Sequence, residues 1–357
     1  MDRYGQEHTH NGSPLTDAAF QALPVAARAA FASAGLRKKC PTCSRCYPVE
    51  YGRAKVIAVV GATGSSKSHY LAALIHALRQ PGLFDRIGLQ LKALSTEDFK
   101  RFNDEFVEPL YRYGRELRLT ATEEVLGPFL FEITNTMAPS KPPLVIALLD
   151  TGGEAQVDPV LRFRYASYLS QAMGIVFLLD PLRMPTVARA LGGGEAAGLD
   201  DPHLISQREM PMINREVISV VRGDLRDADV TDRLLDIPYA AVVSKADLIP
   251  EAERFLNVNA SASRRFELSG IDTETSEVIE YLYSVDESAV VANVLNSYFY
   301  FSFHFAAPTN CPSRLGSDGA RFFERVPEPR RVIEPLLTIL YRRGFLTEAQ
   351  CAGTVSY

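Results

Sequence analysis

The stretch Gly61 to Ser68, GATGSSKS, contains residue types whose spacing directly suggests chemistry. It fits the pattern G-x-x-x-x-G-K-[ST] at every fixed position except one, where Ser66 replaces the second glycine. In such a turn, backbone N–H groups and a helix N-terminus surround phosphate groups. Lys67 adds a positive charge near the β- and γ-phosphates, and Ser68 adds a hydroxyl ligand for Mg²⁺. The predicted phosphate-binding residues are Gly61, Gly64, Ser65, Ser66, Lys67 and Ser68. The alternative is a tight strand-to-helix turn that happens to contain a lysine.

A second motif, DTGG from Asp150 to Gly153, follows the apolar stretch Leu144–Leu149. An acidic residue at the end of a buried strand can hold the hydration shell of Mg²⁺, and a glycine lets a backbone N–H approach the γ-phosphate. The pattern D-x-x-G is common, so an ordinary turn after a strand is the competing interpretation.

A third motif, SKAD from Ser244 to Asp247, ends the apolar stretch AAVV. A carboxylate at Asp247 can accept hydrogen bonds from N1 and N2 of guanine, donors that adenine does not place there, and the stem of Lys245 can cover the base. The alternative is that Asp247 caps a following helix. Three such motifs in order, each at a strand end, predict a guanine-nucleotide site.

Three cysteines, Cys40, Cys43 and Cys46, lie within seven residues, a spacing that suits a compact Zn²⁺ site. A fourth ligand is missing locally. Cys351 is expected to supply it, because a helix after the last strand returns to the sheet edge where the cluster lies, and His8 or His10 are competitors. Three reduced cysteines without metal are the alternative, and an iron–sulfur site lacks the further spaced cysteine.

From Lys55 onward, strand-like and helix-like segments alternate. This alternation predicts an α/β fold with a mostly parallel, doubly wound sheet that has helices on both faces. The expected strands are Val56–Val60, Arg86–Leu94, Phe129–Ile133, Leu144–Leu149, Gly174–Leu179, Pro238–Val243 and Phe299–Phe305. The expected helices are two short ones within Leu15–Leu36, and Lys67–Arg79, Thr96–Tyr113, Ser276–Leu295 and Val332–Tyr341.

The chain has 357 residues, a formal net charge of −5 and 46% hydrophobic residues. This composition supports a large core, and the negative charge argues against nucleic acid as the main partner. The N-terminus lacks a charged-then-apolar signal pattern, and the longest apolar runs are too short to span a membrane. A cytoplasmic protein is expected.

Taken together, GATGSSKS, DTGG and SKAD resemble the first, third and fourth sequence boxes of P-loop GTPases of the translation-factor-related class, over about residues 54–310. The stretch HYLAALI after the phosphate loop and the closing PRRVIEPLLTILYRRGFL are similar to bacterial double-GTPase families of conflict and signalling systems. The resemblance implies GTP or GDP and Mg²⁺ as cofactors. It also implies a protein partner, either a second GTPase or a GAP-like subunit.

The resemblance assigns further roles. A threonine before Phe129 should meet Mg²⁺ and the γ-phosphate; Thr122 is preferred over Thr120, although either could cap a helix. Gly153 and Glu154 should lie near the γ-phosphate. Many relatives carry a glutamine or histidine at the position of Glu154, and a carboxylate there cannot donate to the phosphate, so intrinsic hydrolysis should be slow unless a partner helps. The alternative is that Glu154 points to solvent. The fifth sequence box of the family has a serine and an alanine after the last strand, where they contact the base. This chain has no serine there, which leaves a backbone N–H of Ala306 or Ala307 to contact the base.

The expected organisation is an N-terminal tail with short helices over residues 1–39, a Cys-rich metal-binding turn over 40–53, a GTPase-like domain with insertions over 54–310, and a C-terminal loop and helix over 311–357. The sequence therefore predicts a GTP-binding switch that hydrolyses GTP slowly. A guanine-nucleotide-binding scaffold that scarcely hydrolyses is the alternative, and SKAD disfavours an ATPase.

Overall fold

The computed structural model divides the chain into two compact units, Met1–Ala54 and Lys55–Tyr357. The residues that the structure describes are 9–10, 13–14, 22–24, 37–39, 46–48, 55–62, 65–79, 87–93, 96–117, 129–148, 169, 172–191, 209–223, 234–249, 264–265, 268–317, 319–351 and 354–355.

The first unit contains two short antiparallel pairs. Strand β1 (Thr9–His10) pairs with β2 (Ser13–Pro14), and β3 (Arg37–Lys39) pairs with β4 (Cys46–Pro48). In the second pair, Lys39 lies opposite Cys46. The two helices predicted before residue 37 fall almost wholly outside the described residues.

A seven-stranded sheet forms the centre of the second unit, in the order β12-β10-β9-β5-β8-β7-β6. Its strands are β5 (Lys55–Gly61), β6 (Leu89–Ala93), β7 (Phe129–Asn135), β8 (Leu144–Leu148), β9 (Ala172–Leu179), β10 (Tyr239–Val243) and β12 (Phe301–Phe305). Neighbouring strands from β12 to β8 are parallel, whereas β7 runs antiparallel to both β8 and β6. The predicted mostly parallel sheet is confirmed, with an antiparallel strand inserted near one edge.

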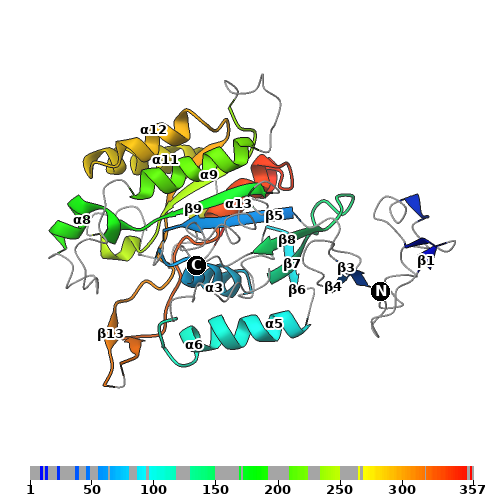
Figure 1. Ribbon diagram of the computed structural model, residues 1–357, viewed down its shortest axis with the longest axis horizontal. Coiled ribbons are helices and arrows are strands. Elements are labelled where there is room, and N and C mark those ends of the chain that lie inside the picture. The colour runs from blue at the N-terminus through cyan, green and yellow to red at the C-terminus, as the bar shows by residue number, and fades with distance from the viewer. Residues whose placement is uncertain are drawn as a thin grey trace. The chain divides into compact units, whose positions relative to one another are not determined.

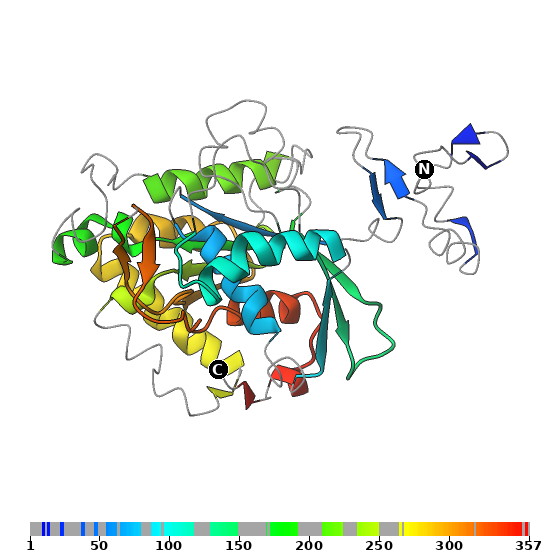
Figure 2. The same ribbon diagram turned by 90° about the horizontal axis from the view of Figure 1, so that it is seen from below.

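Alternating side chains of β5 explain why both faces of the sheet are covered. Ile57 and Val59 belong to one apolar cluster, whereas Ala58 and Val60 belong to another. The first cluster packs against α3 (Lys67–Leu78), α5 (Thr96–Phe102), α6 (Glu108–Tyr111) and α13 (Glu334–Arg342). The second packs against α8 (Pro185–Ala190), α9 (Glu209–Gly223), α11 (Leu268–Ser284) and α12 (Ser288–Leu295). Figures 1 and 2 show these helices on either side of the strands, so the doubly wound arrangement is confirmed.

The single helix predicted over Ser276–Leu295 is wrong, because the structure has two helices there. The backbone of Asp286 adopts a left-handed conformation, with φ of 66°. The N–H of Glu287 bonds to the carbonyl of Leu282 at 2.8 Å, and that of Asp286 to Tyr283 at 3.3 Å. These two bonds form a Schellman motif, which ends α11 before α12 begins.

The segment expected as a loop after β12 is instead a long hairpin, Ala307–Arg330, described apart from residue 318. Ala307 and Arg330 exchange backbone hydrogen bonds of 3.0 and 2.9 Å at its base. Its tip consists of β13 (Ser313–Leu315) and β14 (Arg321–Phe323). Strand β14 also pairs with the segment after α6, because the N–H of Phe323 donates to the carbonyl of Gly114 at 2.7 Å.

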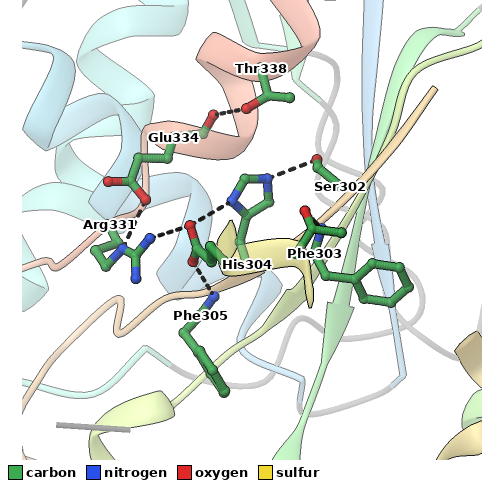
Figure 3. Close-up of polar contacts among 9 residues, drawn as sticks. Ser302, Phe303, His304, Phe305, Arg331, Glu334 and Thr338 are labelled. Atoms are coloured by element: carbon green, nitrogen blue, oxygen red, sulfur yellow. Dashed lines mark hydrogen bonds and ion pairs between the residues drawn. The ribbon is translucent and has the colours of Figure 1, made fainter. Parts of the chain in front are cut away.

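A buried polar cluster joins α11, β12 and α13 (Figure 3). The Arg331 guanidinium contacts the carboxylates of both Glu274 and Glu334, while His304 lies 3.5 Å from Glu274 and 2.8 Å from the Ser302 hydroxyl. Burial would raise the pKa of Glu274, but Arg331 and His304 outweigh it and lower the pKa below its ordinary value. Potential ligand atoms of Glu274, His304 and Glu334 lie within 4.8 Å of one another. Because Arg331 already neutralises these carboxylates, the cluster is best explained as a structural connection.

Candidate functional site: the carboxyl ends of the central strands

The order of the strands identifies the edge of the sheet where a ligand would bind. Strand β5 lies between β8 and β9 and is parallel to both. After β5 the chain builds β6, β7 and β8 on one side, and then crosses to β9 on the other. In open α/β sheets such a switch point opens a crevice at the carboxyl ends of the strands. Helix α3 begins at this edge of the sheet, directly after the turn that follows β5.

Lys67 folds back over the predicted phosphate loop. Its buried ammonium group donates to the carbonyl of Gly61 at 2.9 Å and to that of Ala62 at 2.8 Å. The loop is tight, because the N–H of Ser65 donates to Ala62 at 3.1 Å. A Cβ atom on Gly61 would lie 2.5 Å from the Ser65 hydroxyl and 2.8 Å from the Leu178 carbonyl, so the position needs glycine. The structure brings Gly61, Ser65 and Lys67 together as predicted.

Ser66, the residue that departs from the motif, has a backbone conformation that favours glycine. Its φ of 66° and ψ of 28° are left-handed, and it precedes the first residue of α3. Its side chain makes no capping hydrogen bond. The first turn of α3, which includes Ser68, contains no acidic residue, so the positive end of the helix dipole is not neutralised from within the helix.

The SKAD loop is tied to the phosphate loop through Ser244. The Ser244 hydroxyl lies 3.3 Å from the Ser65 carbonyl and 3.1 Å from the Leu179 carbonyl. Its backbone N–H also donates to Leu179, at 2.8 Å. The loops that follow β5 and β10 are therefore held against each other across the end of β9.

Lys245 makes an ion pair that the sequence interpretation missed. Its ammonium group lies 2.7 Å from Asp180, whose carboxylate also accepts a hydrogen bond from the N–H of Leu182 at 3.0 Å. Asp180 is buried and directly follows β9. An acidic residue after a long apolar strand was the available signal, the same signal that identified Asp150. This pair holds the stem of Lys245 at the carboxyl edge of the sheet.

Asp247 lies in the 3₁₀ turn Ala246–Leu248 with one carboxylate oxygen deeply buried. That oxygen, Oδ1, has no hydrogen-bond partner within the described part of the chain. Burial raises the pKa of Asp247, although a hydrogen bond from its own backbone N–H and the charges of Lys245 and Arg325 act to lower it. A buried acceptor without a donor is costly, so the site favours a ligand that presents N–H groups to this oxygen.

The prediction that Ala306 or Ala307 offers a free backbone N–H is wrong. The N–H of Ala306 donates to Val243 at 3.0 Å, and that of Ala307 donates to Arg330 at 3.0 Å. The parallel ladder between β10 and β12 uses the first donor, and the base of the long hairpin uses the second.

His69 connects α3 to the segment that precedes residues 118–128. Its Nε2 accepts a hydrogen bond from the N–H of Leu117 at 3.3 Å. Burial and the charge of Lys245 lower the pKa of His69 to about 4, although Glu116 acts in the opposite direction, so the ring is neutral near pH 7. Glu116 itself is held by the Arg321 side chain at 2.9 Å.

Several predicted site residues lie outside the described residues and stay predictions: Gly64, Thr120, Thr122, Asp150, Gly153, Glu154, Cys40 and Cys43. Cys351 lies in α14 (Glu348–Cys351) and is buried among apolar side chains of the second unit. Burial raises the pKa of its thiol to about 11. Within the described part of the chain, every helix is too short or too polar to cross a bilayer.

No protein-family model matches this sequence, and no curated protein matches it significantly. Among solved structures, the chain is similar to the signal recognition particle receptor SRb-GTP/SRX complex from Chaetomium thermophilum. That match has 14% identity and a TM-score of 0.30, and it covers 71% of this chain and 91% of the other. The chain is also similar to the GTP-bound Ski7 GTPase-like domain of S. cerevisiae, with 16% identity and a TM-score of 0.33. This match covers 81% of this chain and 50% of the other. The function is therefore argued from the site itself.

Proposed function

We propose that this protein binds GTP with Mg²⁺ at the carboxyl ends of β5 and β10 and hydrolyses it slowly, as a molecular switch. The observation that carries the proposal is the contact between the two predicted loops. Ser244 lies against the backbone of Ser65, while Asp247, three residues later, keeps a buried acceptor without a donor. The turn proposed to bind phosphate and the carboxylate proposed to bind guanine thus lie at the same edge of the sheet.

The phosphate side of the proposal rests on the tight loop and on the start of α3. The backbone of Ser65 and Ser66, together with the first turn of α3, would surround the phosphates. Lys67 would exchange its bonds with the Gly61 and Ala62 carbonyls for phosphate oxygens. The Ser68 hydroxyl, with predicted contributions from Thr122 and Asp150, would hold Mg²⁺. When bound, Mg²⁺ neutralises charge on the β- and γ-phosphates.

The base side rests on Asp247 and Lys245. N1–H and the N2 amino group of guanine are two donors that a single carboxylate can accept. Adenine presents an acceptor at N1, which would face the carboxylate unfavourably. The Asp180–Lys245 pair, at 2.7 Å, would keep the lysine stem extended where it can cover one face of the base.

Slow hydrolysis is proposed because Glu154 follows Gly153 in the position where a side chain would orient the attacking water. A carboxylate can accept a hydrogen bond from water but repels the γ-phosphate. We therefore propose that a partner protein, a second GTPase or a GAP-like subunit of a bacterial signalling or conflict system, accelerates the reaction.

A scaffold that binds GTP without turnover is the second candidate, and Ser66 favours it. Its left-handed backbone and its Cβ atom occur where a close approach of backbone to phosphate is needed. A phosphate loop strained at this point could bind nucleotide and still align the γ-phosphate poorly for hydrolysis.

Zn²⁺ at Cys40, Cys43 and Cys46 is a separate proposal, with His8 or His10 of the same unit as the fourth ligand. The spacing of the three cysteines supports it, and β4, which contains Cys46, pairs with β3 directly before Cys40. Metal analysis of the purified protein tests it. Less than about a tenth of an equivalent of zinc would contradict a closed structural site.

The nucleotide proposal is tested by equilibrium binding of GDP and ADP and by single-turnover hydrolysis of GTP. Lys67→Ala should weaken GDP binding by about 10–100-fold, the effect of losing charged hydrogen bonds. Asp247→Asn should remove the preference for GDP over ADP. Lys92→Ala, which changes an exposed lysine on the edge strand β6, is the matched control and should leave binding unchanged. Equal affinities for GDP and ADP in the wild type would contradict the guanine assignment, and tight GTP binding without turnover would favour the scaffold.

A further inference from the structure

The long hairpin Ala307–Arg330 begins directly after β12, whose following residue Ala306 accepts a hydrogen bond from the N–H of Ala246 in the turn that contains Asp247. On the proposed guanine site, Asp247 would read N1 and N2, which leaves the O6 acceptor of guanine without a donor. The N–H groups of Ala306 and Ala307 are both used by backbone carbonyls. We propose that the guanidinium group of Arg325, on the returning leg of the hairpin, donates to O6 of the bound guanine. This inference rests on the proposed function and adds a specificity-determining residue to it.

The base of the hairpin lies beside Asp247. Strands β10 and β12 are parallel, with Val243 opposite Phe305, so the chain leaves both strands at the same edge of the sheet. The two exits are joined, because the N–H of Ala246 donates to the Ala306 carbonyl at 3.1 Å. The Asp247 turn and the first residues of the hairpin are therefore immediate neighbours.

Arg325 reaches this region because the returning leg pairs with the outgoing one. The N–H of Glu328 donates to the Thr309 carbonyl at 3.1 Å, and the thiol of Cys311 lies 3.6 Å from the carbonyl of Arg325 itself. These contacts place Arg325 opposite Cys311, four residues beyond Ala307. The charge of Arg325 is felt at Asp247, where it acts to lower the pKa of the carboxyl group.

The Arg325 side chain is oriented and still has donors available. One guanidinium nitrogen donates to the backbone carbonyl of Asn310 at 2.6 Å, which fixes the orientation of the planar group. A guanidinium carries five N–H donors, so most of them stay available to a ligand. The side chain of Arg325 is thus held by the Asn310 carbonyl, while its charge still acts on Asp247.

The chemistry of the two side chains fits adjacent positions on one base. Guanine presents N2 and N1 donors and then the O6 acceptor along the same edge, which matches a carboxylate followed by a guanidinium. Arginine is the side chain that most often binds O6 of guanine in other contexts. Adenine carries an amino donor at this position, which would face the guanidinium unfavourably. Asp247 and Arg325 would therefore each favour guanine over adenine, through different atoms of the base.

The test compares four diphosphates on nucleotide-free full-length protein: GDP, IDP, ADP and 6-thioguanosine diphosphate. IDP keeps O6 and lacks the N2 amino group, whereas the thio analogue keeps N1–H and N2 and replaces O6 by a weaker acceptor. Arg325→Ala should weaken GDP and IDP about tenfold and the thio analogue and ADP less than about twofold. Arg314→Ala, an exposed arginine at the hairpin tip, is the control and should change none of them.

Equal losses for GDP and the thio analogue, or no loss for either, would overturn the role of Arg325 while leaving the guanine site intact. Failure of the proposed function gives a different pattern, in which the wild type does not prefer GDP over ADP. Arg325→Lys keeps the charge without the planar fork and should give an intermediate loss for GDP. This variant replaces Arg325→Ala if the alanine protein unfolds at a lower temperature than the wild type.

Discussion

Replacing Ser66 by glycine tests the phosphate loop at the point where its sequence departs from the motif. A residue with a Cβ atom in the left-handed region costs about 1–2 kcal/mol relative to a right-handed conformation. Glycine removes that cost, and its greater freedom in the unfolded chain offsets about 0.4–1 kcal/mol of the gain. Because the Ser66 hydroxyl makes no capping bond, little else is lost. We expect Ser66→Gly to stabilise the protein by about 0.5–1 kcal/mol.

The assay is thermal unfolding of the nucleotide-free protein, followed by circular dichroism. For a unit of this size the expected gain corresponds to a rise in Tm of about 1–3 °C. Ser66→Ala is the matched control, because it removes the hydroxyl and keeps the Cβ atom. Its Tm should stay within about 1 °C of the wild type, since the hydroxyl has no bond to lose.

A second measurement connects the backbone of Ser66 to the proposed function. If the loop binds phosphate, Ser66→Gly should also tighten GDP binding and Ser66→Ala should not. The reasoning is refuted if Ser66→Gly lowers the Tm, or if the alanine and glycine variants behave alike. Either result would mean that the Cβ atom in the left-handed position is not what distinguishes this loop.

Three further predictions concern other parts of the site and its support. Asp180→Asn removes the charged partner of Lys245 and should weaken GDP and ADP by a similar factor of about ten, as measured by nucleotide titration, because the lysine covers either base. The pKa of His69 falls from its ordinary 6.5 to about 4 on folding, so the unfolded chain binds the additional proton. Stability should therefore decrease as the pH falls from 6.5 toward 4, and His69→Gln should reduce this dependence in unfolding experiments at several pH values. Asn135→Ala removes a buried amide that donates to the Phe345 carbonyl at 2.8 Å, and should lower the free energy of unfolding by about 2–3 kcal/mol in denaturant titrations.

The strands of the second unit and helices such as α3 and α13 could be predicted because their signals are local, whereas α8 and α9 lie where no helix was expected. Apolar runs such as Gly174–Leu179 and Pro238–Val243 are long enough to specify buried strands, and the structure places them within a few residues of the expected bounds. The break between α11 and α12 was missed because Asp286 carries no strong signal. A glycine in that left-handed position would have marked the helix end.

The long hairpin could not be predicted, because its sequence has no regular alternation and its pairing is not local. Proline and charged residues interrupt it, as in VPEPRR after Arg325. Its tip forms a ladder with Gly114 and Glu116, about two hundred residues earlier in the chain. An arginine in such a segment looks like an ordinary exposed residue, so Arg325 could not be selected from its surroundings in sequence.

The contacts proposed here to determine the choice of nucleotide depend on the order of the strands. Each motif specifies one residue set at one strand end, but only the order β10-β9-β5 makes the ends neighbours. Ser244 and Ser65 are separated by 179 residues, and their contact passes over the end of β9, where Leu179 bonds to Ser244 and Asp180 bonds to Lys245. The end of β9 therefore separates the predicted phosphate loop after β5 from the loop after β10 that contains Asp247. On the proposed function, its position sets the distance between the groups that would bind the phosphates and the base, so Asp180, which holds Lys245, would belong to the same site as the motifs on either side.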